Sequence, residues 1–200
     1  WRKALPHAEI WEADVNANCI ETHKKALGEL GITPLVGDQA NSSHVRRWLK
    51  EVSGNFDVII DDGAHTNGAI LKTLKALWPK LSRGGRYFIE DMCVGRRQPW
   101  NDGHPLPADV LSYWMNQLIM IDHNKMHHIA HSVQLNHNRT LRGGFPAMPK
   151  DVAFIFCSDC ACVIGKDSGR GHRHVSMGGT RCPNIKGCRQ DSGGVCNKAG

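Results

Sequence analysis

Two acidic residues and a histidine follow directly on a run of strand-forming residues in the first third of the chain. The stretch F-D-V-I-I-D-D-G-A-H spans residues 56–65 and carries Asp61, Asp62 and His65 at its polar end. Carboxylates in such a place can hold a hard cation such as Mg²⁺. A neutral imidazole beside them can take a proton from a substrate hydroxyl. The stretch therefore predicts Asp62 as a metal ligand and His65 as a general base, against the plainer alternative that His65 is only a polar loop residue.

A second acidic pair, Glu90 and Asp91, ends the strand-like run at 86–89. In open parallel sheets the ligand lies outside the carboxyl ends of the strands. If the two strands are neighbours, their spacing of about 4.8 Å brings Asp62, Glu90 and Asp91 to one edge. Three carboxylates there would repel one another unless a cation lies among them. We therefore expect all three to bind Mg²⁺, with helix capping by one acid as the alternative.

Acidic residues also follow two earlier strand-like runs, at Asp14 and Asp38. An acid in this position suits hydrogen bonds from a ribose diol, so Asp14 is predicted to bind the ribose of a cofactor. Asp38, with Gly37 and Gln39, is predicted to line the adenine pocket. Asp61 is grouped with the cofactor-binding residues as an acid that supports the ligands beside it. Helix capping at Asp14 and a plain turn at Asp38 are the structural alternatives.

The elements that must position these residues follow from the hydrophobic spacing. Short apolar runs alternate with segments of helical spacing, which is typical of a parallel sheet with helices on its faces. The run at 56–60 is almost wholly apolar, so we expect a strand buried on both faces. Ser42 or Ser43 should start the second helix. The expected strands cover 8–13, 32–36, 56–60 and 86–89, the helices 18–30, 41–52, 70–81 and 109–121, and a terminal hairpin 152–157 and 161–164.

The length and charge of the chain limit the classes of partner. Its 200 residues fit one ordinary domain. No apolar run approaches the roughly 18 residues of a membrane span, so no membrane partner is expected. Residues 167–200 carry +4 of the formal net charge of +6, and the balanced remainder argues against a nucleic-acid-binding face. We expect a domain over 1–166 and a disordered, basic, Gly-rich tail over 167–200.

Cysteines and histidines offer other ligand sets, but their spacing disfavours them. Three of the eight cysteines crowd the apolar segment 157–162, where we expect them to pack as small apolar residues. We expect the thiols to be reduced, as in a cytoplasmic protein. His123, His127 and His131 recur at four-residue spacing, but the following residues resemble a strand, so zinc is disfavoured there. The tail lacks the close cysteine pair of a structural zinc site.

Two further segments are candidates for contact with a substrate. The stretch 93–107 is irregular and contains Pro and Gly, and its length favours a lid or substrate loop over a passive connection. The stretch 136–150 is expected to add to acceptor specificity. Neither segment carries a signal for a particular substrate, and the sequence carries none for an oligomeric state.

The combined motifs resemble class I S-adenosylmethionine-dependent methyltransferases. Within that class they are most similar to the metal-dependent sugar O-methyltransferases of macrolide biosynthesis and their cephalosporin-hydroxylase-like relatives. The pair D-D-G-x-H and G-G-x-Y-x-I-E-D is specific for this subgroup, and the resemblance covers roughly residues 1–166. The motifs that carry it are A-E-I-W-E-A-D at 8–14, V-G-D-Q at 36–39, F-D-V-I-I-D-D-G-A-H at 56–65, L-S-R-G-G-R-Y-F-I-E-D at 81–91 and V-A-F-I-F-C-S-D-C-A-C-V-I-G-K at 152–166.

The resemblance implies a doubly wound, mostly parallel, Rossmann-like α/β sheet of seven strands with a terminal antiparallel hairpin. It also implies S-adenosylmethionine and Mg²⁺ as cofactors, and transfer of a methyl group to a hydroxyl of a small molecule, with a sugar as the favoured acceptor. Carried over motif by motif, it assigns ribose binding to Asp14, the adenine side to Asp38, metal binding to Asp62, Glu90 and Asp91, and proton removal to His65.

The resemblance also implies elements outside the sequence. The family's first strand and its Gly-rich loop would lie before Trp1, so we expect an N-terminally truncated chain whose sheet lacks its first strand. Two other functions stay open at this point. One is a Rossmann-type nucleotide-binding oxidoreductase, because Asp14 would serve a dinucleotide ribose equally well. The other is a non-catalytic, methyltransferase-like binding module.

Overall fold

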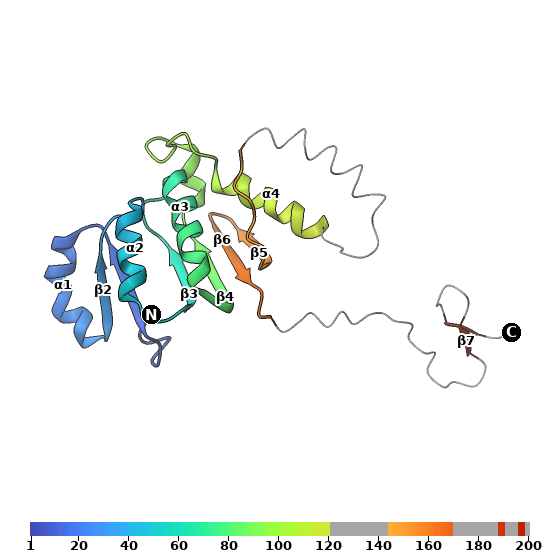
Figure 1. The fold of residues 1–200 in the computed structure, drawn as a ribbon, viewed down its shortest axis with the longest axis horizontal. Coiled ribbons are helices and arrows are strands. Elements are labelled where there is room, and N and C mark those ends of the chain that lie inside the picture. The colour runs from blue at the N-terminus through green and yellow to red at the C-terminus, as the bar shows by residue number, and fades with distance from the viewer. Residues whose placement is uncertain (121–143, 170–187, 191–195, 199–200) are drawn as a thin grey trace. The chain divides into compact units, whose positions relative to one another are not determined.

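Strands and helices alternate along the chain, as the apolar spacing predicts. The computed structural model describes residues 1–120, 144–169, 188–190 and 196–198, which fall into the units Trp1–Asp167 and Ser168–Gly200. Figure 1 shows the alternation in the first unit. Its elements are β1 (Ile10–Asp14), α1 (Ala17–Glu29), β2 (Ile32–Val36), α2 (Ser42–Glu51), β3 (Phe56–Asp61), α3 (Asn67–Leu77), the 3₁₀ turn η1 (Trp78–Lys80), β4 (Leu81–Ile89), the 3₁₀ turn η2 (Met92–Arg96), α4 (Pro107–Met120), β5 (Val152–Ser158) and β6 (Ala161–Lys166).

The strands of this unit form two separate sheets. β1 and β2 pair in parallel, and the second sheet has the order β3-β4-β6-β5. In it β3 and β4 are parallel neighbours, with Ile60 opposite Phe88 and Asp61 opposite Ile89. β6 runs antiparallel to β4 and forms the terminal hairpin with β5. The α/β class and the hairpin are confirmed, and the pairings are mixed, two parallel and two antiparallel. The described residues of this unit hold six strands in two sheets, where one sheet without the first of the family's seven strands was predicted.

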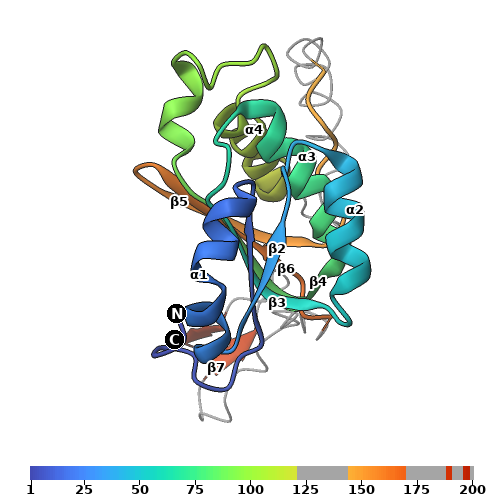
Figure 2. The same cartoon turned by 90° about the vertical axis from the view of Figure 1, so that its left-hand side faces the viewer.

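Helices pack on both sides of the β1–β2 sheet, which makes the fold doubly wound. Trp11 and Leu35 pack with Trp48 of α2. Glu12 and Asp14, which alternate with Trp11 along β1, line a hollow with α1 on the other side. Figure 2 shows α1 and α2 flanking β2.

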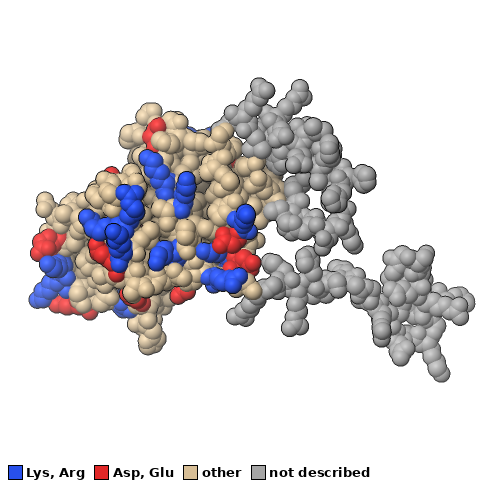
Figure 3. Space-filling view, in the orientation of Figure 1, with Lys and Arg blue, Asp and Glu red and all other residues tan. Residues whose placement is uncertain are grey.

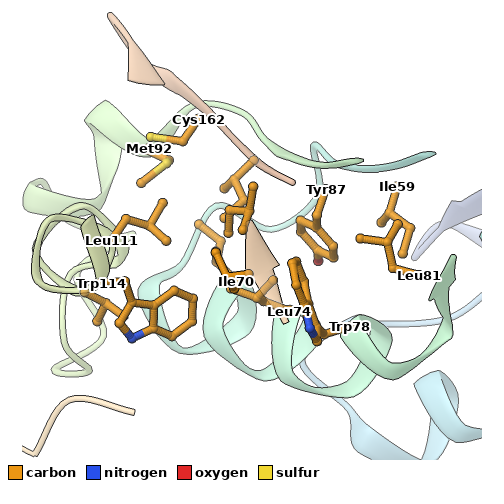
Figure 4. Packing of buried hydrophobic residues seen from close by; sticks show 14 residues of the cluster. Ile59, Ile70, Leu74, Trp78, Leu81, Tyr87, Met92, Leu111, Trp114 and Cys162 are labelled. Atoms are coloured by element: carbon orange, nitrogen blue, oxygen red, sulfur yellow. The ribbon is translucent and has the colours of Figure 1, made fainter. Parts of the chain in front are cut away.

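The main core lies between the second sheet and the helices α3 and α4. Tyr87 and Ile89 of β4 are fully buried, and so is Ile164 of β6. They pack against Ile70 of α3 and Leu111 of α4, as Figure 4 shows for Tyr87, Ile70 and Leu111. This packing fixes β4, and therefore the carboxyl end of β4, against α3.

The opposite face of β3 corrects the prediction of a strand buried on both sides. Ile59 is 8% exposed, but its neighbours Val58 and Ile60 are 47% and 36% exposed. Ile60 heads a cross-strand row through Phe88 and Val163 to Phe156. Phe156 is itself 63% exposed. Burial therefore alternates along this apolar run, because α3 covers only the face of β3 on which Ile59 lies.

Several element ends differ from the predicted ones for local reasons. α2 is capped by Asn41, whose side chain accepts a hydrogen bond from the Ser43 backbone, rather than by a serine. The third helix ends at Leu77, because Pro79 follows within the 3₁₀ turn η1. β4 then begins at Leu81, five residues before the predicted start at Arg86. The S-R-G-G segment is therefore part of a strand, and not a turn.

Four cysteines of the body form disulfides, so the prediction of reduced, apolar packing there was wrong. In the β5–β6 ladder Cys157 lies directly opposite Cys162, and the two are bonded. The Met92 backbone donates a hydrogen bond to the Cys160 carbonyl, which brings Cys93 beside Cys160 for the second bond. Strand register decides the first pairing and the packing of η2 beside the β5–β6 turn the second, and sequence spacing reveals neither. Among the described residues Cys19 is a free, exposed cysteine.

The surface of the first unit in Figure 3 is of mixed charge, and the second unit contains a short pair of strands. On the face in Figure 3, basic and acidic side chains are interspersed with uncharged surface. No described helix combines the length and apolarity that crossing a membrane requires. The second unit contains an antiparallel pair, β7 (Cys188–Gln190) and β8 (Cys196–Lys198), which the prediction of a disordered tail did not include. The remaining tail residues and the histidines at 123, 127 and 131 lie outside the described residues.

Candidate metal and cofactor site

The site forms where β3 and β4 end side by side. The ladder between them continues to the last residue of β3, and the Glu90 backbone donates a hydrogen bond of 3.0 Å to the Asp61 carbonyl. Asp62 and Asp91 therefore leave the sheet at the same edge. The prediction that these strands are neighbours is confirmed.

Three of the predicted residues meet at this edge. One ligand atom each of Asp62, His65 and Asp91 lies within 4.8 Å of the others. His65 Nε2 is 3.9 Å from Asp62 Oδ1 and 3.7 Å from Asp91 Oδ2. The two carboxylates are more than half exposed, whereas the imidazole is 21% exposed. Glu90, the third predicted ligand, is exposed and does not belong to this group.

The backbone at two of these residues is unusual. His65 has a φ of 53° and Asp91 a φ of 51°, both in the left-handed region. Outside glycine this conformation costs of the order of 1–2 kcal/mol, and it persists only where surrounding contacts enforce it. Two such residues facing each other across the strand ends indicate that the cluster is held in place by its surroundings.

The donor set fits a magnesium ion. Mg²⁺ prefers oxygen ligands and commonly takes one or two carboxylates while keeping several waters or substrate oxygens. Asp62 and Asp91 supply these carboxylates, and their exposure leaves room for the remaining ligands. His65 lies close enough to act either as a third donor or as a base for a group bound beside the acids. The arrangement leaves room for the chemistry predicted from the sequence, and metal binding by Asp62, Glu90 and Asp91 stays a prediction.

Asp61 and Gln39, both predicted to bind a cofactor, are joined in a partly buried network instead. Gln39 Nε2 donates to Asp61 Oδ1 at 2.9 Å and to Thr73 Oγ1 at 3.2 Å. The Tyr87 hydroxyl donates to Asp61 Oδ2 at 3.1 Å. Burial raises the pKa of Asp61, although the hydrogen bonds from Gln39 and Tyr87 oppose the rise. Burial, with the charge of Asp61, likewise raises the pKa of Tyr87 well above its ordinary value. Direct cofactor contact by Asp61 and Gln39 stays a prediction.

Asp14, Gly37 and Asp38 lie together at the ends of β1 and β2. The Gly37 backbone donates a hydrogen bond to the Asp14 carbonyl at 2.8 Å. Each acid also closes a local turn: Asp14 Oδ1 accepts from the Asn16 backbone at 2.6 Å, and Asp38 Oδ1 accepts from the Ala40 backbone at 2.8 Å. The turn named as the alternative for Asp38 is therefore present, whereas α1 is capped by Asn16 and not by Asp14. Ribose and adenine binding stay predictions.

Asp14 also borders a small hollow beside α1. The hollow measures about 240 Å³ and includes the polar side chains of Glu12, Cys19 and His23. Ligand pockets usually enclose about 300–1,000 Å³. The hollow is thus large enough for only part of a nucleoside cofactor.

The loop after β4 contains residues that sequence reasoning missed. Asp102 Oδ2 accepts a hydrogen bond of 2.9 Å from the Gly68 backbone in the first turn of α3. Asn67 is fully buried and donates to the Gly95 carbonyl at 2.9 Å. Burial alone would raise the pKa of Asp102, but hydrogen bonds from the Gly68 and His104 backbones and the nearby imidazole of His104 lower it. These contacts hold the predicted lid segment against the helix that follows the metal cluster.

Comparisons with known proteins place the chain near sugar O-methyltransferases. It is 34% identical over 92 residues to mycinamicin VI 2''-O-methyltransferase of Micromonospora griseorubida, covering 46% of this chain and 21% of that protein. It is 47% identical over 91 residues to L-olivosyl-oleandolide 3-O-methyltransferase of Streptomyces antibioticus, covering 46% and 22%. The chain thus matches about a fifth of the length of these relatives. No protein-family model matches it.

A solved structure extends the likeness to the fold. The MycE methyltransferase of the mycinamycin pathway, solved with Mg, SAH and mycinamycin VI, superimposes with a TM-score of 0.56 at 22% sequence identity. The match covers 84% of this chain and 38% of that one. At this identity the likeness establishes the fold, and the activity has to be argued from the site.

Proposed function

We propose that this chain, which has the MycE fold and is homologous over 92 residues to sugar O-methyltransferases, belongs to an S-adenosylmethionine-dependent O-methyltransferase that acts on a small molecule. The observation that carries the proposal is the meeting of Asp62, His65 and Asp91 at the carboxyl ends of β3 and β4. Acids of two different strands and a shielded imidazole at this edge form a site for a metal and a hydroxyl group.

The chain's own residues divide the work. When bound, S-adenosylmethionine supplies the methyl group, and Mg²⁺ supplies positive charge that lowers the pKa of the acceptor hydroxyl. Asp62 and Asp91 bind the metal. His65 accepts the hydroxyl proton at Nε2, which lies beside both carboxylates. The hydroxyl oxygen would take the methyl group as the sulfur–carbon bond of the cofactor breaks, which leaves S-adenosylhomocysteine. His65 would hold the hydroxyl proton until solvent removes it.

The cofactor-binding half uses the ends of β1 and β2. Asp14 binds the ribose diol and Asp38 the adenine side, each with its backbone fixed by the contacts described above. The Mg and SAH in the MycE structure support this cofactor pair. The small size of the hollow beside Asp14 is consistent with a cofactor that also contacts residues outside the described part of the chain.

The favoured acceptor is a sugar of a glycosylated small molecule. The named relatives methylate hydroxyls of sugars on macrolides, such as mycinamicin VI and L-olivosyl-oleandolide. The lid segment held by Asn67 and Asp102 is positioned to contact such an acceptor, since it follows Asp91 directly and packs on the start of α3. Neither a nucleic acid nor a membrane is expected as a partner.

The two disulfides bear on the predicted cytoplasmic location. A cytoplasmic location remains as predicted, but the two disulfides argue against it, because reducing compartments keep such thiols unpaired.

Methyl transfer in the full protein that contains this chain tests the proposal. With methyl-labelled S-adenosylmethionine and a glycosylated macrolide, label should enter the acceptor, and a metal chelator should abolish the transfer. His65→Gln should lower kcat by about 10²-fold or more, the usual contribution of a general base. His7→Gln, at an exposed histidine outside the site, is the matched control. Activity that survives both the chelator and His65→Gln would overturn the proposal.

A further inference from the structure

The loop that carries Asp62 and His65 is held by a side chain from a distant part of the chain. Gln39 Oε1 accepts a hydrogen bond of 2.9 Å from the Ala64 backbone. Ala64 lies between the two cluster residues in sequence. The other end of the same amide donates to Asp61 and Thr73, as described above. One side chain thus connects the exposed loop to buried groups of β3 and α3.

The loop is shaped around this amide. A Cβ added at Gly63 would overlap Gln39 Oε1, so the loop passes directly over the amide and a larger residue there would displace it. Two residues further on, His65 adopts its left-handed backbone with a φ of 53°. Such a conformation requires contacts that outweigh its cost. In the described structure the Ala64 backbone donates to Gln39 just before His65, and the Gly63 backbone is hydrogen-bonded to the Asp61 side chain beside it.

The anchoring groups are themselves rigid. Asp61 is 6% exposed and Thr73 is 4% exposed. Thr73 Oγ1 also donates to the Ala69 carbonyl at 2.9 Å within α3. The amide is therefore fixed at one end and can transmit that rigidity to the loop.

We infer that Gln39 is a positioning residue, which holds the loop 62–65 in the conformation that brings Asp62 and His65 beside Asp91. We call the hydrogen bonds of Gln39 to Ala64, Asp61 and Thr73 the clamp. The metal in this inference rests on the proposed function, whereas the clamp is observed in the structure without a metal. Because Gln39 follows Asp38 directly, the clamp also links the proposed adenine side to the metal side of the site. The affinity of the site for a divalent cation should therefore depend on Gln39, although Gln39 does not contact the cation.

The first test measures the clamp in the metal-free chain. Gln39→Met keeps the length of the side chain but removes both polar ends. Amide hydrogen exchange at Ala64, followed by NMR, should speed up at least tenfold in this variant. Tyr87→Phe is the matched control, because it removes a different hydrogen bond of Asp61 and leaves the Gln39–Ala64 bond in place. Unchanged exchange at Ala64 in Gln39→Met would overturn the inference.

The second test measures the site with Mn²⁺ as the probe, titrated against the chain by electron paramagnetic resonance. Gln39→Met should weaken Mn²⁺ binding about tenfold or more, the range found for residues that support metal ligands. Tyr87→Phe should lower the melting temperature but change the Mn²⁺ affinity less than about threefold. Equal losses of Mn²⁺ affinity in the two variants would mean that Gln39 only stabilises the fold in general, and would overturn the inference.

A third test exchanges the hydrogen-bond donor and acceptor between Gln39 and Asp61 and asks whether Mn²⁺ binding is restored. In Gln39→Glu two carboxylates would face each other, so Mn²⁺ binding should weaken. Combining it with Asp61→Asn restores a donor and an acceptor between the two positions and keeps the net charge. The double variant should recover Mn²⁺ affinity to within about threefold of the parent, and failure to recover would contradict the clamp. If the parent chain binds no Mn²⁺, the metal part of the proposed function fails, and the Ala64 exchange alone decides on the clamp.

Discussion

His65 Nε2 lies 3.7 Å from Asp91 Oδ2, although the two residues follow different strands and both have left-handed backbones. The contact joins the loop after β3 to the turn after β4. It forms because β3 and β4 are parallel neighbours that end at one edge of the sheet. The pairing makes a base and a metal ligand into parts of one site.

The two faces of β3 predict unequal effects of the same substitution. Ile59→Ala should lower the free energy of unfolding by about 3 kcal/mol, because Ile59 belongs to the main core. Ile60→Ala should cost about 1 kcal/mol, since that side chain is 36% exposed on the uncovered face. Urea denaturation of the two variants measures the difference. Equal costs would mean that the outer face is covered in solution.

The disulfides predict a stability that depends on the redox state. The bond between Cys93 and Cys160 closes a span of 67 residues, whereas Cys157 and Cys162 are 5 apart. On a chain-entropy basis Cys93→Ser should cost about 4 kcal/mol and Cys157→Ser about 2 kcal/mol. Denaturation with and without a dithiol reductant measures both. Alkylation of the folded chain at any of these four cysteines, with Cys19 as the reactive reference, would contradict the pairing.

The partly buried contact of Asp151 with Trp78 and Lys166 predicts that the stability of the fold depends on pH. Burial alone would raise the pKa of Asp151, but the hydrogen bond from Trp78 Nε1 and the charge of Lys166 lower it. A lowered folded-state pKa stabilises the fold above the unfolded value of about 3.9, and this gain disappears as the pH falls through the folded value.

Asp151→Asn should therefore lower stability at pH 7 by about 1 kcal/mol or less, since the carboxylate is 47% exposed and solvent screens it. The difference from the parent should be smaller at pH 3, below the unfolded pKa of about 3.9, and should vanish once the pH is also below the folded pKa. Urea denaturation at the two pH values measures it. A deficit of the same size at both would show that the carboxylate charge is not the cause.

The order of the elements and the edge that carries the site could be predicted from the sequence. Apolar runs that end in acids identified the carboxyl ends of β3 and β4. Parallel pairing of the two strands then brings these ends to one edge of the sheet. Glu90 and Asp91 were both predicted to bind the metal, and among the described residues Asp91, but not Glu90, groups with Asp62 and His65. The left-handed backbone at Asp91 is not revealed by its residue type.

Long-range side-chain partners were equally hidden. Gln39 stands in a motif that suggested an adenine pocket, and its amide turned out to bind Asp61 and the Ala64 backbone, 22 and 25 positions away. The pairing of Cys93 with Cys160 likewise depends on how η2 packs beside the β5–β6 turn. Such contacts follow from the folded arrangement and have no local signature.

Mn²⁺ titration of the parent chain, Asp91→Asn and Glu90→Gln is the most direct test of the central claim that Asp62 and Asp91 bind the metal beside His65. The account predicts that the parent binds Mn²⁺, that Asp91→Asn weakens binding about tenfold or more, and that Glu90→Gln changes it less than about threefold. The two substitutions remove the same charge from adjacent residues, so general electrostatics cannot separate them. A parent chain that binds no Mn²⁺, or a loss in Glu90→Gln as large as that in Asp91→Asn, would contradict the claim.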